Sequence, residues 1–387
     1  MRETASEKLI REWIVKHKEA LLFAVMLMMS LYVRFKALPF QSVDYRNTLQ
    51  PWYETIRTGG FHALAEQIGD YPIPYQILIW LLTLIPGEPI VKYKTVFFLS
   101  DLLMALTAGK IADCVAPERK LFASVSACVM CLPEVILNSG YWAQSDSIWS
   151  GFCLLALYSL MKRKYGRSVL FLGIAFSFKI QTVFLFPLFV MFYLREGGFS
   201  ILNALVIPLV FFVLCLPAFL AGRPVFSLFS VYFMQIYEYH EMVVSFPSFW
   251  SLTQLLDFHA YYRLAVVVAF AILGLILYLI LKRNICLSQP DRLLVFAVIT
   301  TWTCVYFLPS MHERYGYLTD ILLVILILCD RDYLPFGIWP LIVSILSYAA
   351  YLSHGTRNLE LMALVHLIAY LGVLMKARSK HCFETAL

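Results

Sequence analysis

Charged residues are scarce in this chain. Only 14% of its 387 residues are Asp, Glu, Lys or Arg, and 61% are hydrophobic. Soluble domains carry about a quarter charged residues, so this composition excludes an ordinary soluble domain and predicts an integral membrane protein. The net charge of +6 does not indicate a nucleic-acid partner, because the basic residues form short clusters between apolar runs, where such clusters set membrane topology.

Cysteines in metal-binding or disulfide patterns are also missing. The nine cysteines are scattered through apolar segments, and Cys128 and Cys131 form a single CxxC without a second pair or a nearby histidine. Cysteines of this kind are usually small buried hydrophobes. The first apolar run, 20–38, lacks a small-residue cleavage site, so we interpret it as a membrane anchor and not as a removed signal peptide.

Apolar runs of near-spanning length predict an all-α, polytopic bundle of about twelve transmembrane helices. The run 168–193 contains Lys179 and Pro187, which predicts a bent or broken span. The predicted spans are 20–38, 73–86, 95–113, 121–137, 148–161, 168–193, 199–220, 262–281, 292–309, 316–329, 335–352 and 359–376.

An even number of spans places both termini on one side of the membrane. Both termini are basic, which indicates that this side is the cytoplasm. Two basic clusters, Lys110/Arg119/Lys120 and Lys162–Arg167, then fall outside. Either the rule is violated twice, or one of the short early segments does not cross.

Two long loops follow from this arrangement, and both are expected outside, carrying short helices. The first loop, 39–72, belongs to a module of residues 20–220, which follows a cytoplasmic segment of residues 1–19. The second loop, 221–261, is rich in aromatics, which favour the membrane interface. A C-terminal module, 262–387, completes the chain.

Polar clusters interrupt the apolar runs. Ionisable groups within membrane spans cost free energy and usually have a function. Each cluster also has a structural alternative. Asp70 and Asp146 could cap the helices that follow them, and Lys179 could snorkel or pair with Asp101 or Asp146. The clusters are Asp44-Tyr45-Arg46, Asp70-Tyr71-Pro72, Gln144-Ser145-Asp146, Lys179-Ile180-Gln181 and His312-Glu313-Arg314; the first could be a solvated loop and the last an ordinary polar loop.

In this order, the clusters resemble motifs of the GT-C superfamily, whose members transfer sugars from polyprenyl phosphates. The glucosyltransferases that extend lipid-linked oligosaccharides have an Asp-Tyr in the first external loop, an aromatic-containing helix after it, and an Asp-Tyr-Pro-Pro segment. They also have a Phe-Lys-Gln-like segment ahead of a proline and a His-Glu-Lys motif. The similar segments here are Asp44-Tyr45 with Trp52, Asp70-Tyr71-Pro72, Phe178-Lys179-Ile180-Gln181 with Pro187, and His312-Glu313-Arg314.

The first mannosyltransferase of GPI-anchor assembly is similar in two further places. Its Asp-x-Asp-Tyr loop matches Val43-Asp44-Tyr45, although Gln41 or Ser42 replaces the earlier acid, and its Asn-Ala-Asp-Ser segment looks like 143–147. The resemblance covers about residues 20–320. The short chain and the His-Glu-Arg-Tyr sequence are closer to bacterial members, which implies the bacterial plasma membrane with an external site; the alternative is the endoplasmic reticulum with a lumenal site.

The resemblance implies an inverting transferase that moves a hexose from a polyprenyl-phosphate donor to a hydroxyl of a lipid-linked glycan or glycolipid acceptor. Asp44 is then the general base. No cofactor is expected, and a divalent metal is not expected to be obligatory, because Asp44 lacks a paired acid. The donor phosphate is expected to contact His312, Arg314, Lys179 and Arg46, and the substrates Tyr45, Asp70, Tyr71, Gln144, Asp146, Gln181 and Glu313.

Other functions compete with this interpretation. A transporter or flippase of lipid-linked sugars is one, although transporters often show inverted repeats and we find none in the sequence. A non-catalytic subunit of a cell-envelope assembly is another. A retaining hydrolase needs two carboxylates about 5–5.5 Å apart, for which Asp44 with Glu66 or Asp70 are candidates.

Overall fold

The computed structural model describes residues 3–380 except 237, 238 and 254, and also Cys382. The residues outside this description fall in the predicted N-terminal segment, second external loop and C-terminal module. The elements of the described part are all helical, with no β-strand among them, which confirms the all-α part of the predicted fold class.

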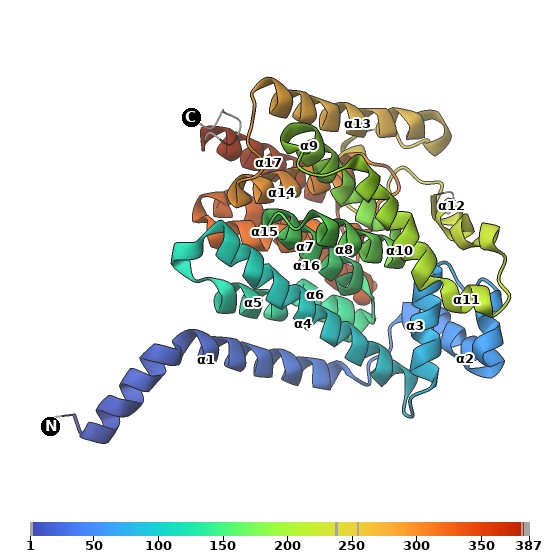
Figure 1. Ribbon diagram of the computed structural model, residues 1–387, viewed down its shortest axis with the longest axis horizontal. Coiled ribbons are helices and arrows are strands. Elements are labelled where there is room, and N and C mark those ends of the chain that lie inside the picture. The colour runs from blue at the N-terminus through green and yellow to red at the C-terminus, as the bar shows by residue number, and fades with distance from the viewer. Residues whose placement is uncertain (1–2, 237–238, 254, 381, 383–387) are drawn as a thin grey trace.

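The α-helices follow one another along the chain from blue to red in Figure 1: α1 (Ala5–Ala37), α2 (Gln50–Gly59), α3 (Ile73–Thr83), α4 (Pro89–Val115), α5 (Phe122–Cys131), α6 (Pro133–Val135), α7 (Asp146–Met161), α8 (Tyr165–Phe178), α9 (Phe186–Glu196), α10 (Val206–Leu214), α11 (Leu216–Leu220), α12 (Ser230–Ile236), α13 (Phe258–Lys282), α14 (Pro290–Phe307), α15 (Tyr317–Cys329), α16 (Leu334–Leu352) and α17 (Leu359–Ser379). Short 3₁₀ or π-helical turns join them: η1 (Tyr45–Leu49), η2 (Gly60–Ala65), η3 (Pro117–Arg119), η4 (Ile136–Trp142), η5 (Ile180–Leu185), η6 (Ile201–Leu205), η7 (Val225–Phe229), η8 (Phe249–Leu252), η9 (Glu313–Gly316) and η10 (Arg331–Tyr333).

Five helical segments in the described residues are long and apolar enough to cross a membrane. They are α1, α4, α13, the continuous segment Arg331–Leu352 that ends with α16, and α17. A sixth is added if α5 and Pro133–Trp142, which meet at a bend of 52°, form one span. This is the composition of a membrane protein, and the count of twelve spans stays a prediction.

The run 168–193 is broken, as its lysine and proline predict. Helix α8 ends at Phe178, and α9 begins at Phe186 after the η5 turn. The ring of Tyr165, at the start of α8, lies 6.1 Å from that of Phe192, near the end of α9. The two helices are therefore antiparallel legs of a hairpin, with Lys179 at the turn between them.

Helix α3 does not carry the chain back to the opposite end of the bundle. Its 11 residues span only about 16 Å at ~1.5 Å per residue, and it runs across the bundle in Figure 1. The Lys94 ammonium, near the start of α4, donates to the carbonyl oxygen of Ala37 over 2.7 Å. Because α4 starts beside the end of α1, the chain that joins them through α3 begins and ends at the same end of the bundle.

The basic clusters consequently share one end of the bundle. Arg119 donates to the carbonyl oxygen of Cys329 over 2.6 Å, and Arg195 donates to that of Asn284 over 2.8 Å. Helix α8 starts and α9 ends at this same end, which brings the Lys162–Arg167 cluster there too. Both N and C labels lie on this side of Figure 1, whereas α2, α3, α11 and α12 gather at the opposite end.

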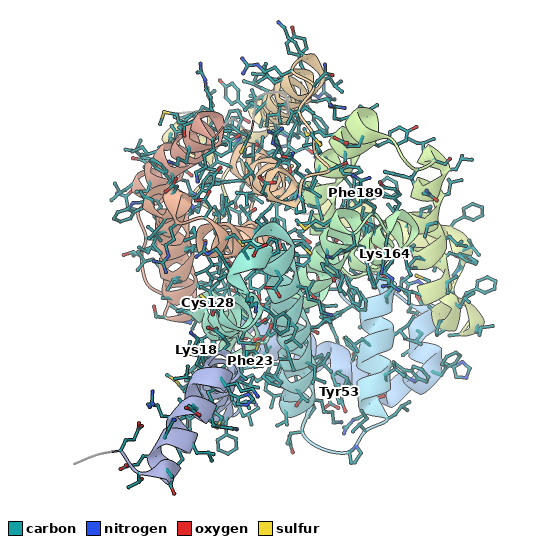
Figure 2. The ribbon with its side chains drawn as sticks, turned by 60° about the vertical axis from the view of Figure 1, so that its left-hand side comes forward. Lys18, Phe23, Tyr53, Cys128, Lys164 and Phe189 are labelled. Atoms are coloured by element: carbon teal, nitrogen blue, oxygen red, sulfur yellow. The ribbon has the colours of Figure 1, made fainter. Side chains whose placement is uncertain are left out.

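Helix α14 forms the centre of the packed interior, and side chains fill the spaces between the ribbons (Figure 2). All of its residues from Leu293 to Phe307 are buried, against α4, α9, α13, α15 and α17. A helix that is buried and mostly apolar on every side is a core helix. Its C-terminus therefore holds the following loop, which carries His312, Glu313 and Arg314, in a fixed position.

Candidate functional site

The carboxylate of Asp44 is held by donors from two other parts of the chain. Trp142 Nε1 and Gln144 Nε2 donate to Oδ2 over 2.7 and 3.0 Å, and the Tyr351 hydroxyl donates to Oδ1 over 2.6 Å. Asp44 itself immediately precedes the η1 turn. These contacts fix the direction of the carboxylate.

Local packing explains why these groups meet. The Ser42 hydroxyl donates to the Trp142 carbonyl oxygen over 2.7 Å, which ties the first loop to the end of η4. Ala143 has a φ of 63°, and this left-handed turn separates the Trp142 and Gln144 side chains. The rings of Trp142 and Tyr351 stack with centroids 4.1 Å apart, so the two donors support each other.

A cavity of about 630 Å³, here called the chamber, surrounds Asp44. Most of the predicted site residues line it, although they come from separate parts of the sequence. Its volume is in the usual range for a ligand site. The chamber is lined by Asp44, Thr48, Leu49, Trp52, Gly69, Asp70, Tyr71, Trp142, Gln144, Tyr239, Val244, Ser245, His312, Glu313, Arg314, Tyr351 and Arg357.

Arg314 presents buried donors to this space. Its Nε and Nη1 atoms are buried without a hydrogen-bond partner in the described residues, and its guanidinium carbon lies 5.5 Å from the centre of the Trp142 ring. Buried polar groups are nearly always paired, and leaving a charged donor unpaired costs free energy. The arrangement is therefore suited to an anion, which guanidinium binds in a forked geometry.

His312 is neutral in this environment. Burial, together with the nearby Arg314 and Lys179 cations, lowers the pKa of His312 to about 3. The imidazole packs against the rings of Tyr239 and Tyr315 with centroids 4.4 and 5.1 Å away. Its Nε2 is buried, with no hydrogen-bond partner among the residues that the structure describes. His312 can thus offer a hydrogen bond to a ligand, but no charge.

Glu313 is bound to the protein itself. It is buried, and its Oε2 accepts a hydrogen bond from the Ser245 hydroxyl in the second loop. Arg357 Nη2 lies 3.7 Å from the same oxygen. Glu313 therefore fixes the second loop over the chamber.

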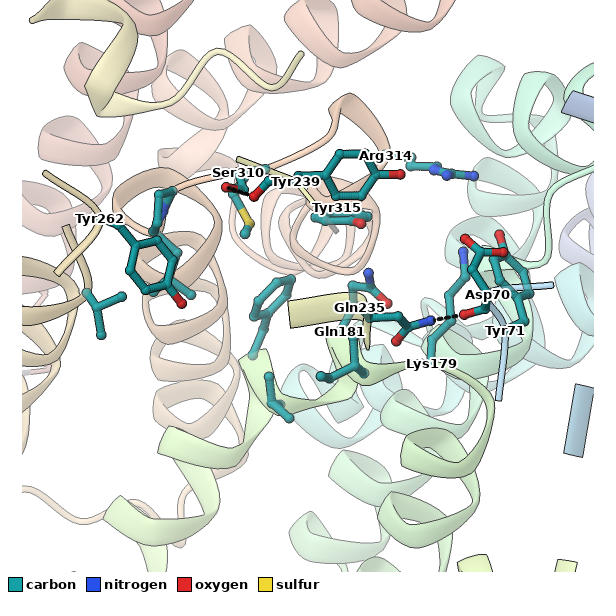
Figure 3. Close-up of a pocket in the computed structure, with 17 residues that line it drawn as sticks. Asp70, Tyr71, Lys179, Gln181, Gln235, Tyr239, Tyr262, Ser310, Arg314 and Tyr315 are labelled. Atoms are coloured by element: carbon teal, nitrogen blue, oxygen red, sulfur yellow. Dashed lines mark hydrogen bonds between the residues drawn. The ribbon is translucent and has the colours of Figure 1, made fainter. Parts of the chain in front are cut away.

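A smaller cavity of about 190 Å³, here called the inner cavity, adjoins the chamber and shares Asp70, Tyr71, Tyr239 and Arg314 with it. Figure 3 shows Arg314, Asp70 and Lys179 gathered at one side of this cavity and Tyr262 at the other. The predicted Gln181 also lines it, and its buried Oε1 has no hydrogen-bond partner within the described part of the chain. Polar groups thus converge where the two cavities meet.

Lys179 pairs with Asp146, which is one of the structural alternatives for this lysine. Its Nζ lies 2.6 Å from Asp146 Oδ1 and 5.0 Å from the centre of the Tyr71 ring. Asp146 also accepts from Asn138 over 2.8 Å and from Trp149 over 3.2 Å, and it is only 1% exposed. The Asp146 carboxylate therefore holds Lys179 in place without lining the chamber or the inner cavity itself.

The capping alternatives for Asp70 and Asp146 are wrong. Pro72 and Ser145 are the N-caps of α3 and α7, and neither helix has a side-chain cap hydrogen bond. Asp70 instead lines the chamber and the inner cavity, while its carbonyl oxygen accepts from Gln235 Nε2 over 2.5 Å. This bond joins the first loop to the second.

An apolar groove of about 470 Å³ continues from the inner cavity between α9 and α13. The two spaces share Val183, Phe184 and Leu308. The remaining lining residues are apolar: Phe186, Pro187, Val190, Met191, Ala269, Phe270, Leu273, Gly274, Leu277 and Cys304. Together the three spaces lead from a carboxylate, past cations, into a hydrocarbon-like groove.

Besides Asp146, two predicted residues line neither the chamber nor the inner cavity. Tyr45 is 1% exposed and packs edge-on against Tyr93 in the core between the first loop and α4; burial raises the pKa of Tyr45 to about 12. Arg46 lines neither the chamber nor the inner cavity. It borders a separate cavity, described below.

In the described part of the chain, no three His, Cys, Asp or Glu side chains converge to hold a metal ion. No protein-family model matches the chain, and no curated protein matches it.

Proposed function

We propose that this protein is a membrane glycosyltransferase that moves a hexose from a polyprenyl-phosphate donor to a hydroxyl of a lipid-linked glycan or glycolipid. The observation that carries the proposal is the continuity of the chamber, the inner cavity and the apolar groove. A lipid-phosphate sugar has the same order of parts: a sugar, an anion and an apolar tail. The proposed site faces away from the cytoplasm, since the basic clusters lie at the opposite end.

In this proposal the sugar lies in the chamber and the phosphate lies beside Arg314. The acceptor oxygen bonds to the anomeric carbon as the bond from that carbon to the phosphate oxygen breaks. The hydroxyl proton passes to the Asp44 carboxylate, and the lipid phosphate leaves with the bonding electrons, stabilised by the guanidinium. A single displacement of this kind inverts the anomeric configuration.

Sugar transfer by the purified full chain in nanodiscs tests the class directly. We expect one member of a panel of short-chain polyprenyl-phosphate hexoses to act as donor with host lipid extract as acceptor. Asp44→Asn should lower the rate by roughly 10²–10⁴-fold, the usual contribution of a general base, with donor binding retained. Glu54→Gln is the matched control, because Glu54 lies in the same loop but pairs with Arg57 on the surface.

Near-normal turnover by Asp44→Asn would contradict the assignment of the base. Binding of lipid-linked sugars without transfer from any donor would instead support the flippase. That alternative uses the same spaces, and broken helices such as α8–η5–α9 occur in transporters.

The groove is tested by filling it. Gly274 on α13 lines the groove, and a Cβ placed there meets nothing within 4 Å. We expect Gly274→Phe to raise KM for long-tailed donors at least about tenfold and to leave KM for donors of one or two isoprene units unchanged. Gly166→Phe is the control, because Gly166 also has open space around it but lies at the start of α8. Equal effects on long and short donors would contradict the placement of the tail.

A further inference from the structure

A fourth space, here called the cationic cavity, adjoins the chamber. It measures about 600 Å³ and shares Tyr351 and Arg357 with the chamber. The residues that line it come from the segment after α1 and from the end of α16 with the loop that follows: Phe40, Gln41, Ser42, Val43, Arg46, Ala350, Tyr351, Leu352, His354, Gly355 and Arg357. It therefore touches Val43, the residue before Asp44, and Arg46, two residues after it.

The charge of this cavity is of one sign. Arg46 and Arg357 are permanent cations, His354 adds a further donor, and none of the described residues that line the cavity is an acid. The backbone N–H of Arg46 donates to the Ser42 carbonyl oxygen over 3.2 Å. Its guanidinium has neither a hydrogen bond nor an ion pair with the described residues and is free to bind. Arg357 Nη1 donates to the Ser347 carbonyl oxygen over 3.1 Å. Its Nη2 forms an ion pair with Glu313 Oε2 at 3.7 Å, a distance too long for a hydrogen bond.

The position of this cavity assigns it to the acceptor and not to the donor. The proposed donor occupies the groove, the inner cavity and the chamber, where Arg314 already faces its phosphate. The cationic cavity meets the chamber at Tyr351, whose hydroxyl contacts Asp44. A molecule bound there reaches Asp44 from a different direction than the donor tail does.

We propose, resting on the function proposed above, that the acceptor is an anion: a hydroxyl compound whose phosphate, diphosphate or carboxylate group lies between Arg46 and Arg357. Two arginines can each offer paired donors to such a group. The acceptor hydroxyl then extends past Tyr351 to Asp44. Arg46, expected from sequence to contact the donor phosphate, belongs in this proposal to the acceptor.

A binding experiment tests the anion site without requiring sugar transfer. The full chain in nanodiscs of neutral lipid is titrated with inorganic pyrophosphate by calorimetry. We expect two classes of site, one weakened at least about tenfold by Arg46→Gln and the other by Arg314→Gln. Arg57→Gln, which removes another cation of the same loop, is the matched control and should change neither. Unchanged pyrophosphate binding in Arg46→Gln overturns the proposal.

A kinetic experiment tests the acceptor class. Three acceptors are compared: a phosphorylated glycolipid, a soluble hexose phosphate and a neutral alkyl glucoside. We expect Arg46→Gln to raise KM for the anionic acceptors about tenfold or more, and Arg57→Gln to leave that KM unchanged. Use of the glycolipid alone identifies a membrane acceptor, and use of both phosphates identifies a headgroup-only requirement; both outcomes support the anionic class.

Preference for the neutral glucoside, with no effect of Arg46→Gln, overturns the proposal that the acceptor is an anion. If no donor supports transfer and the calorimetric site is still lost in Arg46→Gln, the glycosyltransferase proposal fails while the anion site stands. The two proposals can therefore fail separately.

Discussion

Tyr351 donates the shortest of the hydrogen bonds that hold Asp44, and its ring supports Trp142. Tyr351→Phe keeps the ring and removes only the hydroxyl. We expect kcat to fall about 10–100-fold, because a misdirected base reacts poorly, while stability changes by only about 1 kcal/mol. Rates and melting temperature in detergent measure both effects.

Tyr141→Phe is the control for that change, since Tyr141 lies one residue before Trp142 and packs against Phe40. An unaltered kcat in Tyr351→Phe would mean that Trp142 and Gln144 position Asp44 unaided.

The low pKa of His312 makes folding stability depend on pH. The folded chain keeps this imidazole neutral down to about pH 3, whereas the unfolded chain takes up a proton below its ordinary pKa of 6.5. The stability is therefore fully present above that value and is lost as the pH falls toward 3. We expect a loss of about 1.4 kcal/mol between about pH 7.5 and 5.5.

His312→Gln should remove this loss, because glutamine does not titrate. Unfolding of the two proteins in detergent at both pH values makes the comparison. Parallel losses in the variant and the parent would assign the pH dependence to other groups. Among the neighbours, Arg314, Lys179 and Arg357 oppose protonation of His312, and Asp44 favours it.

Single residues could be predicted where polarity interrupts an apolar run. Asp44, Gln144, His312 and Arg314 stand out in the sequence for this reason, and all of them line the chamber. Tyr351 could not be identified, because a tyrosine at the end of an apolar helix has the same appearance as an interfacial aromatic. Tyr45 shows the opposite error, since the sequence cannot tell whether an aromatic beside an acid faces the site or the core.

At the scale of elements, the turn between α8 and α9 depends on a buried ion pair. Lys179→Met leaves Asp146 charged and unpaired inside the protein, and we expect a loss of stability of about 3–5 kcal/mol. Adding Asp146→Asn should restore most of the lost stability, because the double variant contains no unpaired buried charge at this position. Melting temperatures of the single and double variants give the comparison.

Activity separates the two roles of Lys179. If the lysine also binds the donor phosphate, the stable double variant should keep a raised KM for the donor. A double variant with the parental KM would limit Lys179 to a structural role, and one as unstable as Lys179→Met would contradict the ion-pair account.

The two long loops form one cap over the site, which their sequences do not reveal. Arg223 from the second loop is 2% exposed, and its Nη1 donates to the Glu66 carbonyl oxygen and the Gln76 side chain, each over 3.1 Å. Such pairings join residues far apart in the chain and have no local pattern. The break at Lys179 was predictable because a charge and a proline are local signals, whereas the placement of α3 was not, since a short apolar helix at the bundle end has the same composition as a short span.

At the scale of the whole molecule, the side of the membrane on which residue 118 lies distinguishes two topologies. Counting α3 as a span places the η3 turn outside, whereas the structure places it at the basic end, beside Cys329. We expect Glu118→Cys to react with an impermeant maleimide only after cells are permeabilised, because basic ends face the cytoplasm.

His62→Cys, at an exposed position of the η2 turn in the first loop, should react in intact cells. Labelling is scored above that of the parent chain, whose native cysteines are buried or half-buried. Reaction of Glu118→Cys in intact cells would reverse the proposed orientation.

The residues that contact Asp44 are synthesised at different times during translation. A ribosome makes the acid early, adds Trp142 and Gln144 a third of the way along, and releases Tyr351 only with the last pair of helices. Under the proposed function, a partly synthesised chain contains the general base but lacks the side chains that orient it. Such a chain therefore does not cleave the donor lipids of the membrane. A premature stop codon before α16 should therefore yield an inactive protein, and not one that hydrolyses the donor lipid without transferring its sugar.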